Sequence, residues 1–159
     1  MKINKTNAAR VLDKEKILYR MQAYEVDEND LSAAHLAAQL GEDPAKIFKT
    51  LVLKGDKTGY LVCVVPGDAE LDLKKAARLS GNKSCAMIPV KDLQNVTGYI
   101  RGGCSPLAMK KRFPTFIDES VELWPEVYVS AGLRGVQLVV PPDGLVRAAG
   151  AVVGDLVMA

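Results

Sequence analysis

Runs of apolar residues mark out strands along almost the whole chain. The two strongest runs are residues 47–53 and 60–65, and the Gly-Asp-Lys-Thr-Gly segment between them predicts the turn of a β-hairpin. Shorter apolar runs predict further strands at residues 18–26, 86–89, 115–117, 127–130 and 136–140.

Helical segments lie between these strands, and several carry capping residues. Thr6 precedes a helix, Ser32 begins an alanine-rich helix that Gly41 closes, and Asp72 begins a helix that Gly81 closes. Shorter helical segments are expected after Asp43, at residues 90–96 and at residues 142–150. Because the crossovers are irregular and one hairpin is expected, the order favours an α/β fold: a single mixed α/β domain over residues 1–159, with a mixed, partly antiparallel sheet surrounded by helices.

Composition places the chain among ordinary globular proteins. Of its 159 residues 48% are hydrophobic and 25% are charged, as in an average domain. No apolar run has the length of a signal peptide core or of a membrane-spanning helix. Three widely spaced cysteines and one histidine give no zinc-ligand cluster. We therefore expect a cytoplasmic protein with reduced thiols, no metal, no cofactor and no membrane contact.

The formal net charge of +2 is a sum of unlike segments. Residues 25–30 carry four acids and no base, which predicts a solvated loop. Residues 73–83 and 93–117 carry bases and no acid, and such stretches suit an anionic polymer such as a nucleic acid. If both stretches lie on one side, that side would contact nucleic acid through Lys74, Lys75, Lys110, Lys111 and Arg112.

Two features could form a binding site. Strand alternation puts Lys49 on one face with three aliphatic residues, so the lysine either reaches water past its apolar stem or stands at the mouth of a pocket that takes an anion or a carbonyl. Residues 97–106 contain three glycines, and such a loop is either an ordinary turn or a source of bare N–H donors for a phosphate or an oxyanion.

A protein nucleophile is hard to identify. Cys104 follows the glycine pair, but a cysteine nucleophile usually needs a base, and His35 lies far upstream in an apolar helix. No carboxylate pair, Ser-His-Asp order, P-loop or dinucleotide fingerprint is present. A hydrolase of this sequence would need another way to activate its attacking group.

Four strings taken together resemble the YbaK/EbsC family of the prolyl-tRNA synthetase editing-domain superfamily. They are FKTLVL at 48–53, LDLKKAA at 71–77, TGYIRGGCSPLAMKKRFP at 97–114 and VYVSAGLRG at 127–135, and their order covers nearly the whole chain. The resemblance implies an enzyme that removes cysteine in trans from mischarged tRNA(Pro), because cysteine and proline are too similar in size for one selective step. It implies the tRNA acceptor end as ligand and prolyl-tRNA synthetase as a candidate partner.

The resemblance also assigns roles to residues. Lys49 matches the family's essential lysine, which contacts the 3′-terminal nucleotide, and it is the catalytic candidate. The family's chemistry is substrate-assisted: the thiol of the substrate cysteine attacks its own ester and leaves a thiolactone, an intramolecular attack of high effective molarity. The substrate-binding candidates are Tyr24, Thr50, Gly102, Gly103, Ser130 and Gly132.

Two positions depart from the family pattern. Ala108 stands after Ser-Pro-Leu where members usually carry glycine, and Ala131 follows Ser130 where glycine is also usual. The methyl group of Ala131 would either narrow the amino-acid pocket or be neutral if φ is negative there. Three alternatives therefore stay open: a deacylase for another mischarged tRNA such as Ala-tRNA(Pro), a non-catalytic tRNA- or nucleotide-binding regulatory module, and a cysteine hydrolase built on Cys104. The sequence leaves the oligomeric state undetermined.

Overall fold

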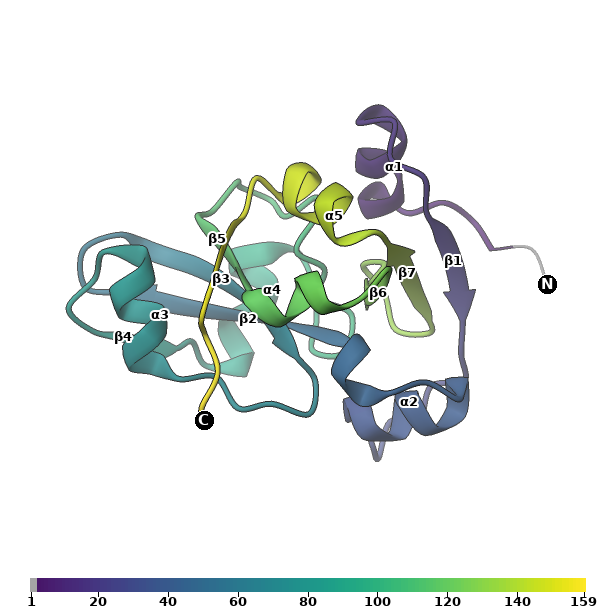
Figure 1. The fold of residues 1–159 in the computed structure, drawn as a ribbon, viewed down its shortest axis with the longest axis horizontal. Coiled ribbons are helices and arrows are strands. Elements are labelled where there is room, and N and C mark those ends of the chain that lie inside the picture. Colours follow the sequence, from purple (N-terminus) through teal and green to yellow (C-terminus); the bar gives the residue numbers. More distant parts are fainter. Residues whose placement is uncertain (1–2) are drawn as a thin grey trace.

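The computed structural model describes residues 3–159 as a mixed α/β fold with two sheets (Figure 1). The strands are β1 (Arg20–Ala23), β2 (Phe48–Gly55), β3 (Gly59–Pro66), β4 (Cys85–Met87), β5 (Thr115–Asp118), β6 (Val127–Ser130), β7 (Val136–Val140) and β8 (Val152–Gly154). The helices are α1 (Asn7–Lys14), α2 (Ala33–Leu40), α3 (Leu73–Ser80), α4 (Leu93–Thr97) and α5 (Pro142–Ala149), with short 3₁₀ turns η1 (Pro44–Lys46), η2 (Val90–Asp92) and η3 (Glu119–Leu123).

The predicted caps begin and end the helices. Thr6 and Ser32 accept hydrogen bonds from main-chain N–H groups three residues later, which satisfies donors that the first helical turn leaves free. The Asp72 side chain does the same for α3. Gly41 and Gly81 end α2 and α3 in the left-handed conformation, which glycine adopts at low cost.

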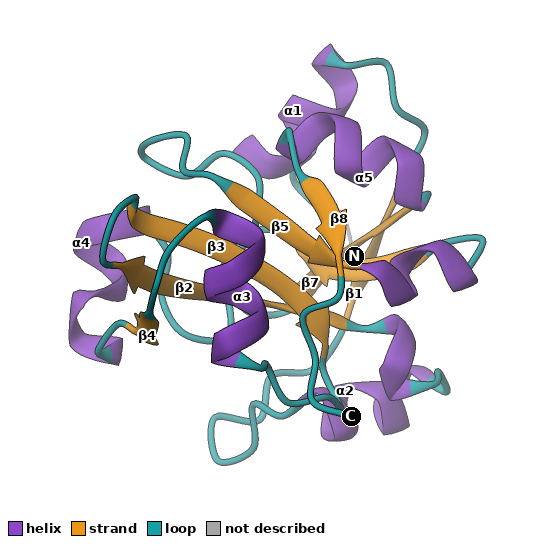
Figure 2. Cartoon of the chain, turned by 60° about the vertical axis from the view of Figure 1, so that its left-hand side comes forward, coloured by secondary structure: helices purple, strands orange, loops and turns teal. Residues whose placement is uncertain are grey.

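The larger sheet has the strand order β4-β2-β3-β5-β8. The hairpin β2–β3 is antiparallel, as predicted, while β5 and β8 add in parallel on its far side. Helix α3 covers one face of this sheet (Figure 2). No helix within residues 3–159 has the length and apolar character needed to cross a membrane.

The smaller sheet has the order β1-β7-β6 and is wholly antiparallel. It meets the larger sheet at an isolated parallel bridge between Ile47 and Tyr128. Helix α2 packs over its outer face, where Ala37 and Val139 share a small cluster with that bridge. The two sheets thus meet at the beginning of β2.

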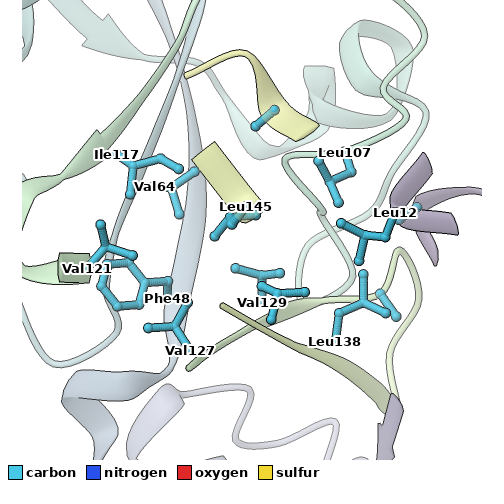
Figure 3. Packing of buried hydrophobic residues seen from close by; sticks show 14 of the residues in the cluster. Leu12, Phe48, Val64, Leu107, Ile117, Val121, Val127, Val129, Leu138 and Leu145 are labelled. Atoms are coloured by element: carbon cyan, nitrogen blue, oxygen red, sulfur yellow. The ribbon is translucent and has the colours of Figure 1, made fainter. Parts of the chain in front are cut away.

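The main core fills the space between the sheets and helices α1 and α5. Leu12, Val64, Ile117, Leu138 and Leu145 are fully buried there and come from five different elements (Figure 3). A second cluster lies on the opposite face of β2 and β3, beneath α3. Because β2 and β3 are apolar on both faces, most of their buried residues belong to one of these two clusters.

The mixed α/β class is confirmed, with three differences in detail. The strand predicted at residues 18–26 spans only Arg20–Ala23, so Tyr24 lies just beyond its end. The strands form two sheets rather than one, because β1 pairs with β7 and not with the hairpin. Strand β8 was missed because it has three residues and follows the last helix after a single glycine and alanine.

Candidate functional site

A cavity of about 570 Å³ opens where the two sheets meet. Its walls are the beginning of β2, the segment from Tyr24 to Leu36, and the glycine-rich loop at Gly102 and Cys104, while Ser130 and Gln137 come from β6 and β7. A cavity of this size at a junction of structural units is the usual form of a small-ligand site.

The beginning of β2 offers its main chain to this cavity. Strand β4 pairs only with residues 53–55 of β2, and just beyond it Ile88 N–H donates to Val52 O. In an antiparallel strand alternate residues point their N–H and C=O to the same side. The peptide groups of Phe48 and Thr50 therefore point away from β3. Phe48 lies beside the bridge between Ile47 and Tyr128, whereas the Thr50 peptide group faces a part of this edge that no strand among residues 3–159 pairs, where a ligand can bond with it.

Lys49 lines the same cavity from the β3 side of β2, half-buried and held by carbonyl groups of the segment that follows β3. Its Nζ donates to Ala69 O at 2.7 Å and to Gly67 O at 3.4 Å. Desolvation lowers the pKa of Lys49 below the ordinary lysine value, and the nearby acids Asp68 and Glu70 oppose that shift. An ammonium has three donors, and residues 3–159 give Lys49 no third hydrogen-bond partner. The geometry therefore favours the pocket alternative over a lysine that merely reaches water.

The structure brings most of the predicted substrate-binding residues to the cavity. Tyr24, Thr50, Gly102 and Ser130 line it together with Lys49. Tyr24 is fixed by its N–H, which donates to Gly135 O at 2.9 Å. These residues come from distant parts of the chain. The separate sequence strings that resemble the family therefore meet at one site in the structure.

Gly103 and Gly132 do not line the cavity, so their predicted contact with substrate has no support in the geometry. A Cβ on Gly103 would lie 3.1 Å from the main chain of Leu133 and Arg134, so glycine is required for two loops to pack closely. Gly132 has a φ of +106°, and its N–H donates to Ser130 Oγ at 3.1 Å. Both glycines shape the wall behind the cavity instead of touching its contents.

The two departures from the family pattern have separate structural consequences. Ala108 has a φ of +60°, a conformation that favours glycine, so its methyl group adds backbone strain. Ala131 is fully buried in the main core, has no positive φ and does not line the cavity. Its methyl group therefore leaves the amino-acid pocket as wide as it would otherwise be.

Cys104 lines the cavity but is a poor nucleophile. Only 9% of the residue is exposed, and burial raises the pKa of its thiol to about 12. A thiol with this pKa is almost wholly protonated at neutral pH, whereas the reactive form is the thiolate. The cysteine-hydrolase alternative loses its chemical basis.

The acidic loop at residues 25–30 is exposed, as predicted, but it also forms one wall of the cavity. Glu25, Asp27 and Asp30 all line the cavity, and His35 lies 3.8 Å from each of the two aspartates. The loop is tied to α2 where Gln39 Nε2 donates to Glu25 O. Its acidity indicated a loop but not what the loop faces.

Two further polar residues at the site escaped the sequence analysis. Gln137 lines the cavity from β7, only 5% exposed, and its Oε1 has no hydrogen-bond partner within residues 3–159. A glutamine within the apolar strand 136–140 is as unusual as a lysine within β2, so the argument used for Lys49 could have found it. Arg101 lines the cavity beside Gly102 and is exposed.

The two basic stretches pack through their apolar neighbours on different clusters of the larger sheet, so the prediction that they form one nucleic-acid-binding side has no support in this packing. Helix α3, with Lys74 and Lys75, packs on the cluster that contains Ala76. The segment around Lys110, Lys111 and Arg112 packs on the main core through its neighbours Met109 and Phe113. In addition, Lys75 Nζ is paired with Asp155 at 2.9 Å and donates to Val157 O.

Comparisons with known proteins agree with this arrangement. The chain is 48% identical over 141 residues to the Enterococcus faecalis protein named "Putative Cys-tRNA(Pro)/Cys-tRNA(Cys) deacylase EbsC", covering 89% of this chain and 86% of the relative. A crystal structure of "a putative trans-editing enzyme for prolyl tRNA synthetase" superposes with a TM-score of 0.81 at 27% identity, covering 96% and 93% of the two chains. The crystal structure of hypothetical protein APE2540 gives a TM-score of 0.87 at 25% identity, with coverages of 96% and 100%.

The matched region contains the cavity almost completely. Residues 27–148 match the family described as "Aminoacyl-tRNA editing domain", and this range includes Lys49, Gly102, Ser130 and Gln137 but not Tyr24. The likeness to both crystal structures extends over nearly all of each chain, as the resemblance of the four sequence strings predicts. This chain belongs to the aminoacyl-tRNA editing domain family.

Proposed function

We propose that the protein is an aminoacyl-tRNA deacylase that removes cysteine in trans from mischarged tRNA(Pro). The observation that carries the proposal is the half-buried Lys49 ammonium, which lines the cavity and is held by two carbonyls of the segment that follows β3. The name of the 48%-identical relative supports cysteine as the amino acid and deacylation as the reaction.

The cavity can bind the end of an aminoacylated tRNA in one direction. Lys49 and Arg101 are the cations at the cavity, and they take the negatively charged 3′-terminal nucleotide. The Thr50 N–H and C=O on the free strand edge hydrogen-bond the ribose or the ester. The amino acid then occupies the remainder of the cavity, between the acidic loop and Ser130.

The substrate supplies the nucleophile in this proposal. The cysteine thiol attacks its own ester carbon, a C–S bond forms, and the bond from that carbon to the tRNA 3′ oxygen breaks. The thiol proton passes to the departing 3′ oxygen, which leaves free tRNA and a thiolactone that water hydrolyses later. Lys49 favours the negative charge that develops on the ester oxygens, and the high thiol pKa of Cys104 agrees with a reaction that does not use the protein's own cysteine.

Several wider assignments belong to the proposal. The chain acts as one editing domain over residues 1–159 in the cytoplasm. Its substrate is the acceptor end of mischarged tRNA, and prolyl-tRNA synthetase is the candidate partner that supplies tRNA selectivity. The structural likeness to a trans-editing enzyme described for that synthetase supports this partner.

A deacylation panel with Cys-, Ala- and Pro-tRNA(Pro) tests the proposal. We expect Cys-tRNA(Pro) to be hydrolysed fastest, and Lys49→Ala to lower kcat/KM by about 10²–10³, the usual loss when one preorganised charge donor is removed. The matched control is Lys54→Ala, an exposed lysine on the same strand, which should keep full activity. Cys104→Ala should also keep it.

Each other result has a distinct meaning. Equal hydrolysis of Pro-tRNA(Pro) would exclude proofreading, and undiminished activity of Lys49→Ala would exclude the assigned site. Preference for Ala-tRNA(Pro) would change the proposed substrate amino acid from cysteine to alanine but would support deacylation as the reaction. Binding of tRNA ends without turnover of any substrate would favour the regulatory-module alternative.

A further inference from the structure

Gln137 presents an unused hydrogen-bond acceptor to the cavity. The residue is 95% buried, yet its Oε1 atom has no partner in the described part of the chain. A buried carboxamide oxygen without a partner costs free energy, and native proteins keep such groups chiefly where a ligand or water completes them. Because Gln137 lines the cavity, the missing partner would come from the cavity's contents.

Two hydroxyl oxygens belong to the same binding surface. Ser130 on β6 stands directly opposite Gln137 on β7, and such cross-strand pairs have adjacent side chains on one face of the sheet. Thr50 lines the cavity from β2, and its buried Oγ1 also has no partner among residues 3–159. Three side-chain oxygens from three strands therefore belong to residues that line the cavity, and two of them have no hydrogen-bond partner in the part of the chain that the structure describes.

A protonated amine is the ligand group that fits these oxygens best. An ammonium carries three N–H donors and can satisfy three acceptors at once. The acidic loop strengthens the preference, since Glu25, Asp27 and Asp30 line the same cavity and attract positive charge. A thiol has one donor and would leave one of the two unpartnered oxygens without a donor, and a methyl group would leave both.

An amino-acid ester of a nucleotide carries one such group, its free α-amino group. The nucleotide at its other end is anionic. The charges of the ester are therefore complementary to those of the cavity, which has Lys49 and Arg101 as cations and the acidic loop as a wall. The geometry points to Gln137, with Thr50 and Ser130, as the subsite for the protonated α-amino group of the substrate. This inference rests on the proposed deacylase function.

The subsite defines a class of substrate. Esters with a free α-amino group are accepted, whereas N-acylated esters, including peptidyl-tRNA, are rejected. An acyl group removes the positive charge and two of the three donors, and it adds bulk beside Gln137. The same cavity would therefore spare the chains that a ribosome is elongating, whatever amino acid joins them to the tRNA.

The test compares Cys-tRNA(Pro) with N-acetyl-Cys-tRNA(Pro), which keeps the attacking thiol. For the wild-type protein we expect kcat/KM to be about 10- to 100-fold lower with the N-acetyl substrate, as for loss of a charged hydrogen bond. Gln137→Leu should lower kcat/KM for the free-amine substrate about tenfold and leave the N-acetyl value unchanged. Gln137→Glu keeps an acceptor and should keep the preference.

Gln22→Leu is the matched control, because Gln22 pairs with Gln137 across β1 and β7 but does not line the cavity. It should leave both rates unchanged. Equal rates for the two substrates in the wild-type protein would overturn the subsite while leaving the deacylase function intact. No hydrolysis of Cys-tRNA(Pro) at all would instead contradict the proposed function. The wild-type comparison decides the matter even if Gln137→Leu does not fold.

Discussion

Replacing Gly132 by alanine would test how the wall behind the cavity is built. Gly132 has a φ of +106°, and an added Cβ would lie 3.0 Å from Cε1 of Tyr99. The Tyr99 hydroxyl donates to Leu107 O at 2.6 Å, so its ring joins the 131–133 turn to the loop that carries Gly102. A methyl group at Gly132 would therefore move Tyr99 and, through it, one wall of the cavity.

The magnitude follows from comparison with Gly41→Ala. Gly41 has a φ of +67°, and no atom of residues 3–159 lies within 4 Å of an added Cβ, so its replacement measures the backbone cost alone, about 1 kcal/mol. At Gly132 the contact with Tyr99 adds about 1–3 kcal/mol of overpacking. Because each kcal/mol lowers Tm by about 2–4 °C in a chain of this size, Gly132→Ala should melt at least about 2 °C below Gly41→Ala.

Thermal unfolding and deacylation kinetics together check this reasoning. Gly41→Ala should keep its kcat/KM for Cys-tRNA(Pro), whereas Gly132→Ala should lose about tenfold, because Ser130 Oγ accepts from the Gly132 N–H that would shift. Equal melting temperatures of the two variants would show that the contact with Tyr99 costs no free energy and that Gly132 is not needed for close packing there. A Gly132→Ala protein with full activity would show that this turn does not position the site.

Three further predictions concern strain, titration and tRNA binding. Ala108→Gly should raise the free energy of unfolding by about 0.5–1 kcal/mol, since φ is +60° there, and an unchanged urea midpoint would contradict this. In an NMR titration Lys49 should lose its proton at a lower pH than Lys75. Burial lowers the pKa of Lys49, whereas the Asp155 carboxylate raises the pKa of Lys75. Because deacylation needs the Lys49 ammonium, its rate should decline as the pH rises through the Lys49 pKa. Arg101→Ala should reduce the salt dependence of tRNA binding by about one unit of slope, while Lys74→Ala, on the far face of the sheet from the main core, should leave the slope unchanged.

Local signals explain which elements the sequence could predict. The ends of α2 and α3 depend on neighbouring residues alone, since a side chain caps the first turn and a glycine closes the last. The β2–β3 hairpin likewise depends on two apolar runs and a five-residue turn. The division into two sheets depends on which distant strands pair, and no local pattern of β1 indicates that its partner is β7.

The same limit applies to the site. Lys49 was identifiable because a charge in an apolar strand is locally unusual, whereas Gly103 and Gly132 were assigned to the cavity from motif membership. Whether a glycine touches ligand or permits close packing depends on which residue lies opposite it. Tyr99 lies opposite Gly132 and Arg134 lies opposite Gly103, and neither contact can be read from the local sequence. The basic stretches illustrate a related limit, because clustering along the chain does not specify which cluster of the sheet each stretch packs on.

The pairing of β1 with β7 has a consequence for how the protein is made. Arg20 pairs with Val139, so β1, near the start of the chain, cannot pair until β7, near its end, is available. Such distant pairings form late, because closing the long intervening segment loses chain entropy before the strand contacts can offset that loss. Tyr24, at the end of β1, and Gln137, within β7, face the same cavity. During synthesis we therefore expect the hairpin to form early and the cavity to be completed only when β7 pairs with β1, so a chain that ends before β7 should lack the complete cavity.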